Sequence, residues 1–515
     1  MKKVFAWLLC AAMVLGGVAL AQEAETVVVL SDETITVNGE AITESSSAPV
    51  YLAEEVQLHE DVPEDLKDLA NRVVVVAASG SYRFSGTATD IQIAVRAQQT
   101  DTVRLILDNA NLTCRTAPAI VVESAADPRT PGQYGVTIEL AGDNKVTGSH
   151  TVRINDDDVK YDGAIDSLVS LGFEGAGSLT VDADNEGIEV KFGHLTINGG
   201  AFHVTSGDDP LNVSEDGVGV LTVNDGYLYT AVKPAQGGEG DGIDSNGYIV
   251  FNGGTAINLA HPSSGDSGID SDMGSSVNGG VIAGAGNMYD PIETSSEQLF
   301  MMLEFAESTD QLVVVTDQMD TPVFAYDFPH SYTYIAFSTP ELKEGETYRV
   351  YLGGEIEGES QDGLYTAITS YVPGQLMQHG EGTANAMGGM MPMGGGMPEN
   401  MTPPEGFENP FGGVDLNELL KDKDLNELLQ DKDLNGLLTG FALTDLFTDE
   451  EIKEHFGDVT LPEMPDENRG FGGGRGMGGG FGGGPRSLES SADVATTDFV
   501  LTQETSGFTN IRSAQ

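Results

Sequence analysis

The stretch that decides the fold repeats one short phrase five times between Asp162 and Asp272. The copies read Asp162-Gly-Ala-Ile165-Asp166, Asn185-Glu-Gly-Ile188-Glu189, Asp208-Asp-Pro-Leu211-Asn212, Gly240-Asp-Gly-Ile243-Asp244 and Asp266-Ser-Gly-Ile269-Asp270. Their apolar residues are 23, 23, 32 and 26 positions apart. A short repeat without a helical stripe is typical of a solenoid in which each repeat forms one coil. We therefore predict an all-β fold, a right-handed parallel β-helix.

An acid or an amide follows each of these apolar residues directly. Neighbouring side chains of a strand point to opposite faces. If the apolar residue faces the core, the next one faces solvent, and we expect an outward ladder of Asp166, Glu189, Asn212, Asp244 and Asp270. Stacked carboxylates about 4.8 Å apart repel by roughly 3 kcal/mol at an effective dielectric constant of about 20. No basic partner is expected nearby, because residues 155–290 contain no arginine and only Lys160, Lys191 and Lys233.

Crowded oxygen ligands without basic partners suit Ca²⁺, which takes six to eight carboxylate and carbonyl oxygens in flexible geometry. We predict calcium sites along the ladder. The expected ligands are Asp162, Asp166, Glu186, Glu189, Asp208, Asp209, Asn212, Asp241, Asp244, Asp266 and Asp270. The alternative is that Asp and Gly serve only as turn residues. Turns do not require an acid or amide directly after each core residue, so the repeat as a whole favours calcium.

The first 21 residues have the pattern of a secretory signal peptide. Met1-Lys2-Lys3 precedes an apolar run from Val4 to Leu20, which ends in an Ala-Leu-Ala cleavage motif. No later run is long enough to span a bilayer. We expect a protein that is secreted, with possible association to the cell surface. Only Cys114 remains after cleavage, so we expect no intrachain disulfide.

The formal charge of −57 argues against nucleic acid and anionic membranes as partners. An acidic polysaccharide would also be repelled unless divalent cations bridge the two. The only tryptophan, Trp7, lies in the predicted leader. A sugar-binding platform must therefore use tyrosine, and Tyr227 and Tyr229, which share one strand face, are the candidates.

The chain divides by composition into an acidic segment (22–71), the β-helix (72–296), a small antiparallel β domain (297–372), a low-complexity linker (373–490) and a C-terminal strand or tail (491–515). Within the linker, a ninefold repeat over residues 415–438 predicts short helices. Asn198, Asn224, Asn252 and Asn278 end strand patterns 26, 28 and 26 residues apart. They form an internal hydrogen-bonded ladder or, as we favour, serve as left-handed turn residues.

Several motifs together resemble a known family. They are Tyr82-Arg-Phe-Ser-Gly86, Val103-Arg-Leu-Ile-Leu-Asp108, the Gly-Asp-Gly-Ile-Asp phrase, Glu341-Leu-Lys-Glu-Gly-Glu-Thr-Tyr348 and Tyr351-Leu-Gly-Gly354. Over residues 70–372 the chain resembles the secreted bacterial carbohydrate-binding domain family, which has a pectate-lyase-like, calcium-containing parallel β-helix. The resemblance implies non-catalytic binding of polysaccharides, cellulose-like or polygalacturonate-like, and makes residues 498–511 a candidate displaced final strand.

Two other classes of function stay open. A pectate-type lyase would need calcium and a basic side chain, for which Lys160, Lys191 and Lys233 are candidates along with nearby histidines. A polygalacturonase-like hydrolase would need paired carboxylates. Fragments of that kind occur at Gly207-Asp208-Asp209 and Asp241-Gly-Ile-Asp244, but in reverse chain order. The third possibility is a purely structural surface adhesin.

Overall fold

The computed structural model describes residues 25–42, 48–56, 62–154, 159–380, 495–503 and 505–514. In these ranges the chain forms strands and turns without helix, so the all-β prediction is confirmed. No described helix could therefore cross a membrane. The chain divides into two units, residues 1–387 with 484–515 and residues 388–483, and every described residue belongs to the first. The predicted leader and the predicted leucine-repeat helices lie outside the described residues.

Three parallel ladders organise the strands. The first contains β1 (Thr26–Leu30), β6 (Gly80–Thr89), β8 (Val103–Thr113), β10 (Val136–Ala141), β15 (Leu171–Gly175), β18 (His194–Ile197), β21 (Val220–Val223), β24 (Tyr248–Phe251) and β26 (Ser275–Val277). The second runs from β8 through β11 (Asp143–Gly148), β16 (Ser178–Ala183), β19 (Ala201–Ser206), β22 (Tyr227–Val232) and β25 (Thr255–Leu259) to β27 (Val281–Gly286).

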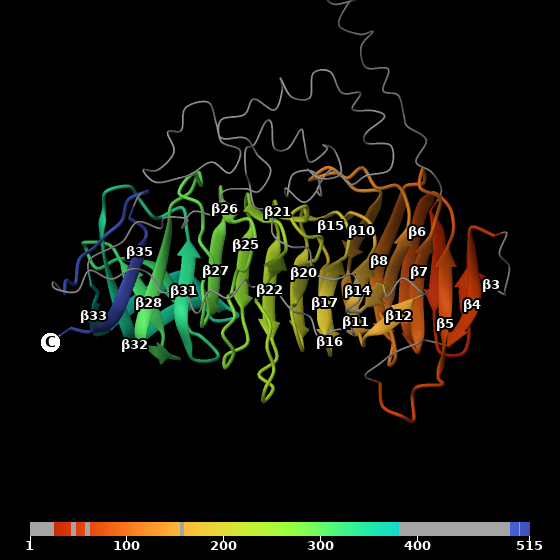
Figure 1. Cartoon of the computed structure of the whole chain (residues 1–515), viewed down its shortest axis with the longest axis horizontal. Helices are drawn as coiled ribbons and strands as arrows, with labels where there is room; N and C mark the ends of the chain where they lie inside the picture. The colour runs from red at the N-terminus through yellow and green to blue at the C-terminus, as the bar shows by residue number, and fades with distance from the viewer. Residues whose placement is uncertain are drawn as a thin grey trace, which may run out of the picture. The chain divides into compact units, whose positions relative to one another are not determined.

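The third ladder carries the repeated acidic phrase. Its strands are β5 (Ala70–Val76), β7 (Ile91–Arg96), β9 (Ile120–Ser124), β14 (Gly163–Ser167), β17 (Glu186–Val190), β20 (Leu211–Val213) and β23 (Asp244–Ser245), with β4 (Val50–Val56) antiparallel to β5. From β14 to β25 consecutive strands of the chain belong to different ladders, so each repeat adds one strand to each ladder. Figure 1 shows these strands following one another in chain order, from orange to green.

The register of the third ladder stacks the apolar residues of the repeat. Ile120, Ile165, Ile188 and Leu211 are paired in sequence, and all four are fully buried. Each such side chain contributes about 1.5–3 kcal/mol by leaving water. In three of the five copies a glycine directly precedes the apolar residue, and the close approach of the neighbouring coil requires it. A Cβ at Gly187 would lie 2.3 Å from the Pro210 carbonyl oxygen.

The strands beyond Gly286 are mostly antiparallel. They are β28 (Phe300–Thr309), β29 (Val313–Thr316), β30 (Pro322–Tyr326), β31 (Tyr332–Ser338), β32 (Thr347–Gln361), β33 (Leu364–Gln378), β34 (Phe499–Val500) and β35 (Gly507–Ser513). β31 pairs with β27, which joins this part to the second ladder, and β35 lies parallel to β28. β33 runs past residue 372, where we predicted a linker to begin. Short strands complete the list: β2 (Thr36–Val37), β3 (Glu40–Ala41), β12 (Val152–Ile154) and β13 (Val159–Tyr161).

The four strand-ending asparagines form a ladder, and our preference for turn residues is wrong. None of them has positive φ, a conformation that the glycines two positions later adopt, such as Gly226 at 105°. The side-chain nitrogens of Asn224, Asn252 and Asn278 instead donate to the asparagine oxygen one coil earlier, at 2.7, 2.8 and 2.9 Å. The ladder is not internal, because Asn198 and Asn252 are exposed.

Candidate functional site

The third ladder brings the predicted acids together. Asp166, Glu189, Asn212 and Asp244 occupy consecutive paired positions on β14, β17, β20 and β23. Asp270 continues the row, since its amide donates to the Ile243 carbonyl at 2.9 Å and its carbonyl accepts from the Ser245 amide at 3.2 Å. The five side chains therefore follow one another along the coils.

The prediction that this row faces solvent is wrong at its first members. Asp166 is fully buried and Glu189 is 3% exposed, whereas Asn212, Asp244 and Asp270 are half-buried. The turn before β14 folds back onto the first carboxylate. The amides of Asp162 and Gly163 donate to Asp166 Oδ2 at 3.1 and 3.3 Å. Strand alternation predicts on which face of the sheet a side chain lies. It does not predict whether a neighbouring turn covers that side chain.

Lys191 also contradicts the expectation that no basic group serves the ladder. Its Nζ contacts the Asp162 carboxylate, lies 2.5 Å from Glu189 Oε2 and 4.0 Å from Asp166 Oδ2. The signal was present in the sequence, because Lys191 is two residues after Glu189 and so shares its strand face. This group of residues, Asp162, Asp166, Glu189 and Lys191, is called the lysine cluster below.

The acids of the lysine cluster stabilise the positive charge of Lys191. Burial disfavours the charged form of Lys191, but the carboxylates of Glu189, Asp166 and Asp162 raise its pKa above the ordinary value. Burial likewise opposes ionisation of Asp162, yet Lys191 keeps the pKa of that acid below its ordinary value. Burial raises the pKa of Asp166 to about 7. The three carboxylates therefore favour the protonated form of Lys191.

One coil further on, a second group has no such cation. Carboxylate oxygens of Glu186, Asp208 and Asp209 lie within 4.8 Å of one another. Glu186 and Asp209 are each 8% exposed, and Glu186 Oε2 has no hydrogen-bond partner among the described residues. Asn212 Nδ2 donates to Glu186 Oε1 at 3.4 Å, while Asn212 Oδ1 is buried without a partner. We call these four residues the open cluster.

Carboxylate and amide oxygens that lie together, two of them buried without a hydrogen-bond donor, fit the donor set of calcium. Glu186 Oε2 and Asn212 Oδ1 are the atoms that a cation would satisfy. The open cluster thus passes the chemical test for a metal centre, whereas Lys191 already supplies the positive charge in the lysine cluster.

The carboxylates of the later acids accept hydrogen bonds from backbone amides of the neighbouring coil. Asp209 Oδ1 accepts from the Asp241 amide at 2.6 Å, and Asp241 Oδ1 accepts from the Ser267 amide at 2.6 Å. Asp266 Oδ2 accepts from the Gly240 amide at 2.8 Å. These bonds support the turn-residue alternative for one oxygen of each acid. The other carboxylate oxygens, Asp209 Oδ2, Asp241 Oδ2 and Asp266 Oδ1, do not take part in these three bonds.

The electrostatics of this region reflect burial first and carboxylate repulsion second. Burial, reinforced by neighbouring acids, raises the pKa of Asp208 to about 6 and of Asp244 to about 7. The same causes raise the pKa values of four more acids well above their ordinary values: Glu186, Asp209, Asp241 and Asp270. In the absence of a cation, folding brings negatively charged carboxylates close together, and they repel one another.

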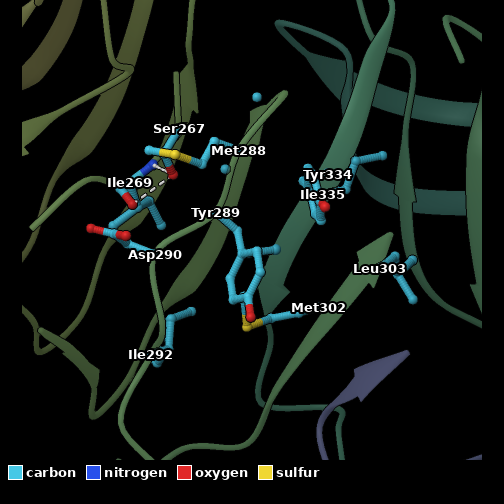
Figure 2. Close-up of a pocket in the computed structure, with 14 residues that line it drawn as sticks. Ser267, Ile269, Met288, Tyr289, Asp290, Ile292, Met302, Leu303, Tyr334 and Ile335 are labelled. Carbon is cyan, nitrogen blue, oxygen red and sulfur yellow. Dashed lines mark hydrogen bonds between the residues drawn. The ribbon is translucent and has the colours of Figure 1, made fainter. Parts of the chain in front are cut away.

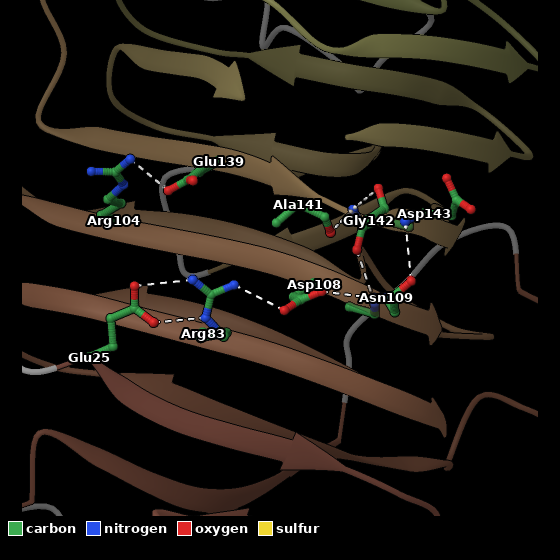
Figure 3. Close-up of polar contacts among 11 residues, drawn as sticks. Glu25, Arg83, Arg104, Asp108, Asn109, Glu139, Ala141, Gly142 and Asp143 are labelled. Carbon is green, nitrogen blue, oxygen red and sulfur yellow. Dashed lines mark hydrogen bonds and ion pairs between the residues drawn. The ribbon is translucent and has the colours of Figure 1, made fainter. Parts of the chain in front are cut away.

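Arginines provide compensation elsewhere in the described chain. Figure 3 shows Arg83 between Glu25 and Asp108, with nitrogen–oxygen distances of 2.7 and 3.0 Å, and Arg104 beside Glu139 at 2.6 Å. No described arginine forms an ion pair with a residue of the open cluster. Acids of the first coils are therefore matched by arginine, and those of the open cluster are not.

Asp290 extends the acidic row and was missed by sequence analysis, because it lies outside the repeated phrase. Its Oδ2 accepts from the Ser271 amide at 3.0 Å, and after burial it is the largest influence raising the pKa of Asp270. It borders a pocket lined mainly by apolar side chains. Figure 2 shows Asp290 on one side of this pocket and Leu303 and Tyr334 on the other.

The predicted tyrosine platform lies under a hairpin turn. Tyr227 and Tyr229 on β22 are half-buried, with ring centroids 5.7 and 5.5 Å from that of His203. Asp362, in the turn between β32 and β33, accepts from the Tyr227 hydroxyl and lies 2.8 Å from His203 Nε2. The carboxylate occupies a position where a sugar hydroxyl could otherwise contact the tyrosine.

Comparisons with known proteins find similarity over part of the chain. A family model described as carbohydrate-binding domain-containing protein matches residues 70–318. The chain is similar to these proteins. One such relative, from Acetivibrio thermocellus, is 34% identical over 140 residues, which are 26% of this chain and 46% of the relative. The match thus spans about half of that relative.

A solved structure gives a weaker likeness. It is described as a polysaccharide lyase-like protein from C. thermocellum, in a gadolinium derivative. It is 23% identical, with 50% of this chain and 94% of that chain covered, at a TM-score of 0.34.

Proposed function

We propose that this is a secreted, calcium-dependent polysaccharide-binding protein that recognises uronate-containing glycans of the plant cell-wall type without cleaving them. The open cluster carries the proposal. It buries carboxylates within 4.8 Å of one another without a cation from the described chain. A divalent ion would offset their repulsion, and the similarity to carbohydrate-binding domain-containing proteins supports a glycan as ligand.

The architecture that we infer is a right-handed parallel β-helix. Support comes from the three parallel ladders and from the rotation of consecutive strands among them. Right-handed crossovers are the rule where parallel strands are joined. In this arrangement each coil presents its acids at the same place, which gives a row of cation sites parallel to an extended polymer.

Calcium would hold the glycan as well as the protein. A chain of net charge −57 repels a polyuronate. Cations between the two sets of carboxylates reverse that repulsion. Asp208, Asp244 and Asp270 are half-buried and so reach both solvent and the interior. Glu186 and Asp209 would anchor an ion from below, because they are more deeply buried.

The protonation of Lys191 favours a binding function over a pectate-lyase function. A lyase base must accept the proton next to the uronate carboxyl. Lys191 is the candidate base beside the acids, and its raised pKa keeps it protonated. Unsaturated products, followed by their ultraviolet absorbance during incubation with polygalacturonate, would contradict this part of the proposal.

The test of the proposed function is affinity electrophoresis through gels that contain polygalacturonate. We expect retardation in calcium, and its loss in EDTA. Asp244→Ala combined with Asp270→Ala should weaken retardation while the β-rich circular dichroism spectrum is kept. Equal mobility with and without polygalacturonate in calcium would refute the proposal.

A further inference from the structure

A second surface of the described chain has chemistry opposite to that of the acids. Asn198, Asn224, Asn252 and Asn278 directly follow β18, β21, β24 and β26 of the first ladder and are joined by the hydrogen bonds given above. The row ends at an aromatic side chain, since Asn198 Nδ2 donates to the Tyr134 hydroxyl at 2.8 Å. It is therefore a continuous line of amides ending in a phenol.

Two strands beside this line, β21 and β24, carry no charged residue at their outer positions. β21 and β24 alternate half-exposed and buried residues. The half-exposed positions are Val220, Thr222, Tyr248 and Val250. The uncharged stretch is bounded by acids, since Glu293 lies against the Tyr248 hydroxyl and Glu174 lies near Tyr134. Polar surfaces without charge match ligands that carry hydroxyl groups and no charge.

The amides keep binding capacity after they form the ladder. Each side-chain nitrogen has two hydrogens and each oxygen two lone pairs, and the ladder uses one of each. The free donors and acceptors recur with the coil spacing of about 4.8 Å, which is close to the length of one sugar ring in an extended chain. A chain that lies along this line can therefore meet one asparagine at each sugar.

Tyr134 supplies a flat group at the end of the line. Its ring lies against Gly172, where an added Cβ would be 2.3 Å from the ring, so the close contact depends on glycine. The ring is half-buried. Exposed carboxylates border the line at Asp225 and Glu297. They disfavour a polyanionic ligand and leave an uncharged one unaffected.

We propose that the asparagine line, with Tyr134 and Thr222, is a second glycan-binding surface that takes an uncharged polysaccharide chain and needs no calcium. The inference rests on the proposed glycan-binding function. The two surfaces are separate along each coil, because β19 lies between Asn198 and the Asp208 of the open cluster. One protein could then hold an acidic and a neutral polymer at once.

The experiment is affinity electrophoresis with hydroxyethyl cellulose as the uncharged probe, in calcium and in EDTA. We expect equal retardation in both. Asn224→Ala with Asn252→Ala removes two contacts and should weaken retardation about tenfold, while polygalacturonate retardation in calcium is kept. Thr222→Lys leaves the ladder intact and should weaken binding too, whereas Thr180→Lys, at an exposed position of the second ladder, should not.

The outcomes separate the two proposals. Retardation by polygalacturonate in calcium without retardation by hydroxyethyl cellulose overturns the second surface and leaves the proposed function standing. Retardation by hydroxyethyl cellulose that persists in both the asparagine variant and Thr222→Lys also overturns it. If neither polymer retards the protein, the proposed function fails and the second surface fails with it.

Discussion

At Glu186 the chain buries a carboxylate oxygen that no described hydrogen-bond donor reaches. Burial of such a group without a partner is costly, and a nearby second carboxylate raises the cost. Proteins keep arrangements of this kind where a ligand compensates for them. A bound cation accounts for Glu186, Asp208 and Asp209 together, whereas a role in turns accounts only for the backbone bond of Asp209.

Replacement of Glu186 should therefore change two properties in opposite directions. Glu186→Gln removes a calcium ligand and should weaken calcium binding about tenfold or more, as measured by isothermal titration. It also removes a repelling charge, so the calcium-free variant should unfold at a higher urea concentration than the parent. Glu307→Gln makes the same charge change at an exposed position of β28 and should alter neither. Loss of stability without calcium in the Glu186 variant would contradict this account.

Lys191 allows a matching test in the lysine cluster. Lys191→Met leaves buried carboxylates without their cation and should cost about 3 kcal/mol or more of unfolding free energy in calcium-free buffer. Calcium should restore most of this loss, because the variant exposes a new set of oxygen ligands. Lys233→Met, which removes a half-exposed pairing with Asp182, is the control. A loss that calcium does not reduce would show that Lys191 has a role that calcium cannot replace.

The sequence predicted which residues form the acidic row better than it predicted how deeply they are buried. The repeat spacing placed Asp166, Glu189 and Asn212 in one row, as found. Their burial could not be foreseen, because it depends on turns from neighbouring coils. Lys191 was foreseeable from its position two residues after Glu189, whereas Asp290 carries no repeat signal.

At the scale of strands, the third ladder determines how stability depends on pH. Several of its acids have folded-state pKa values above the ordinary value near 3.8, with Asp208 at about 6 and Asp166 and Asp244 at about 7. A folded state that binds protons more tightly than the unfolded state loses stability as pH rises. In calcium-free buffer we expect the urea midpoint to fall between pH 4 and about pH 7.

Calcium should remove or reverse this trend, because ligands must be deprotonated to bind it. Urea midpoints at the two ends of the pH range, with and without calcium, provide the measurement. A calcium-free midpoint that rises with pH would contradict the assigned burial of these acids.

Strand positions followed from alternation and repeat spacing, but their ends did not. The asparagine prediction failed because an Asn-Gly pair suits both a turn and a ladder, and only the register of neighbouring coils distinguishes them. β33 continues to Gln378 because it pairs with β32 and β35, a partner more than 120 residues away in sequence. Local sequence carries no trace of such a pairing.

At the scale of the whole molecule, 24 basic residues can pair with only some of the 81 acids, which leaves a net charge of −57. Arginines pair with acids on the early coils, Lys191 pairs with the acids of one cluster, and we propose a metal ion for the open cluster. Magnesium is a poor substitute in this account, since it requires tighter octahedral geometry and gives up water reluctantly. Stability, metal binding and glycan binding are then linked through one set of carboxylates.

Thermal unfolding in calcium, in magnesium and in EDTA at constant ionic strength tests this link most directly. At calcium a hundredfold above its dissociation constant, one site adds about 2.7 kcal/mol to the unfolding free energy. We expect a clear rise in melting temperature with calcium, a much smaller one with magnesium, and about half the stabilisation in Glu186→Gln at the same calcium concentration, because a tenfold weaker site adds about 1.4 kcal/mol. The same melting temperature in calcium and in EDTA would contradict the central claim and leave the acids as turn residues.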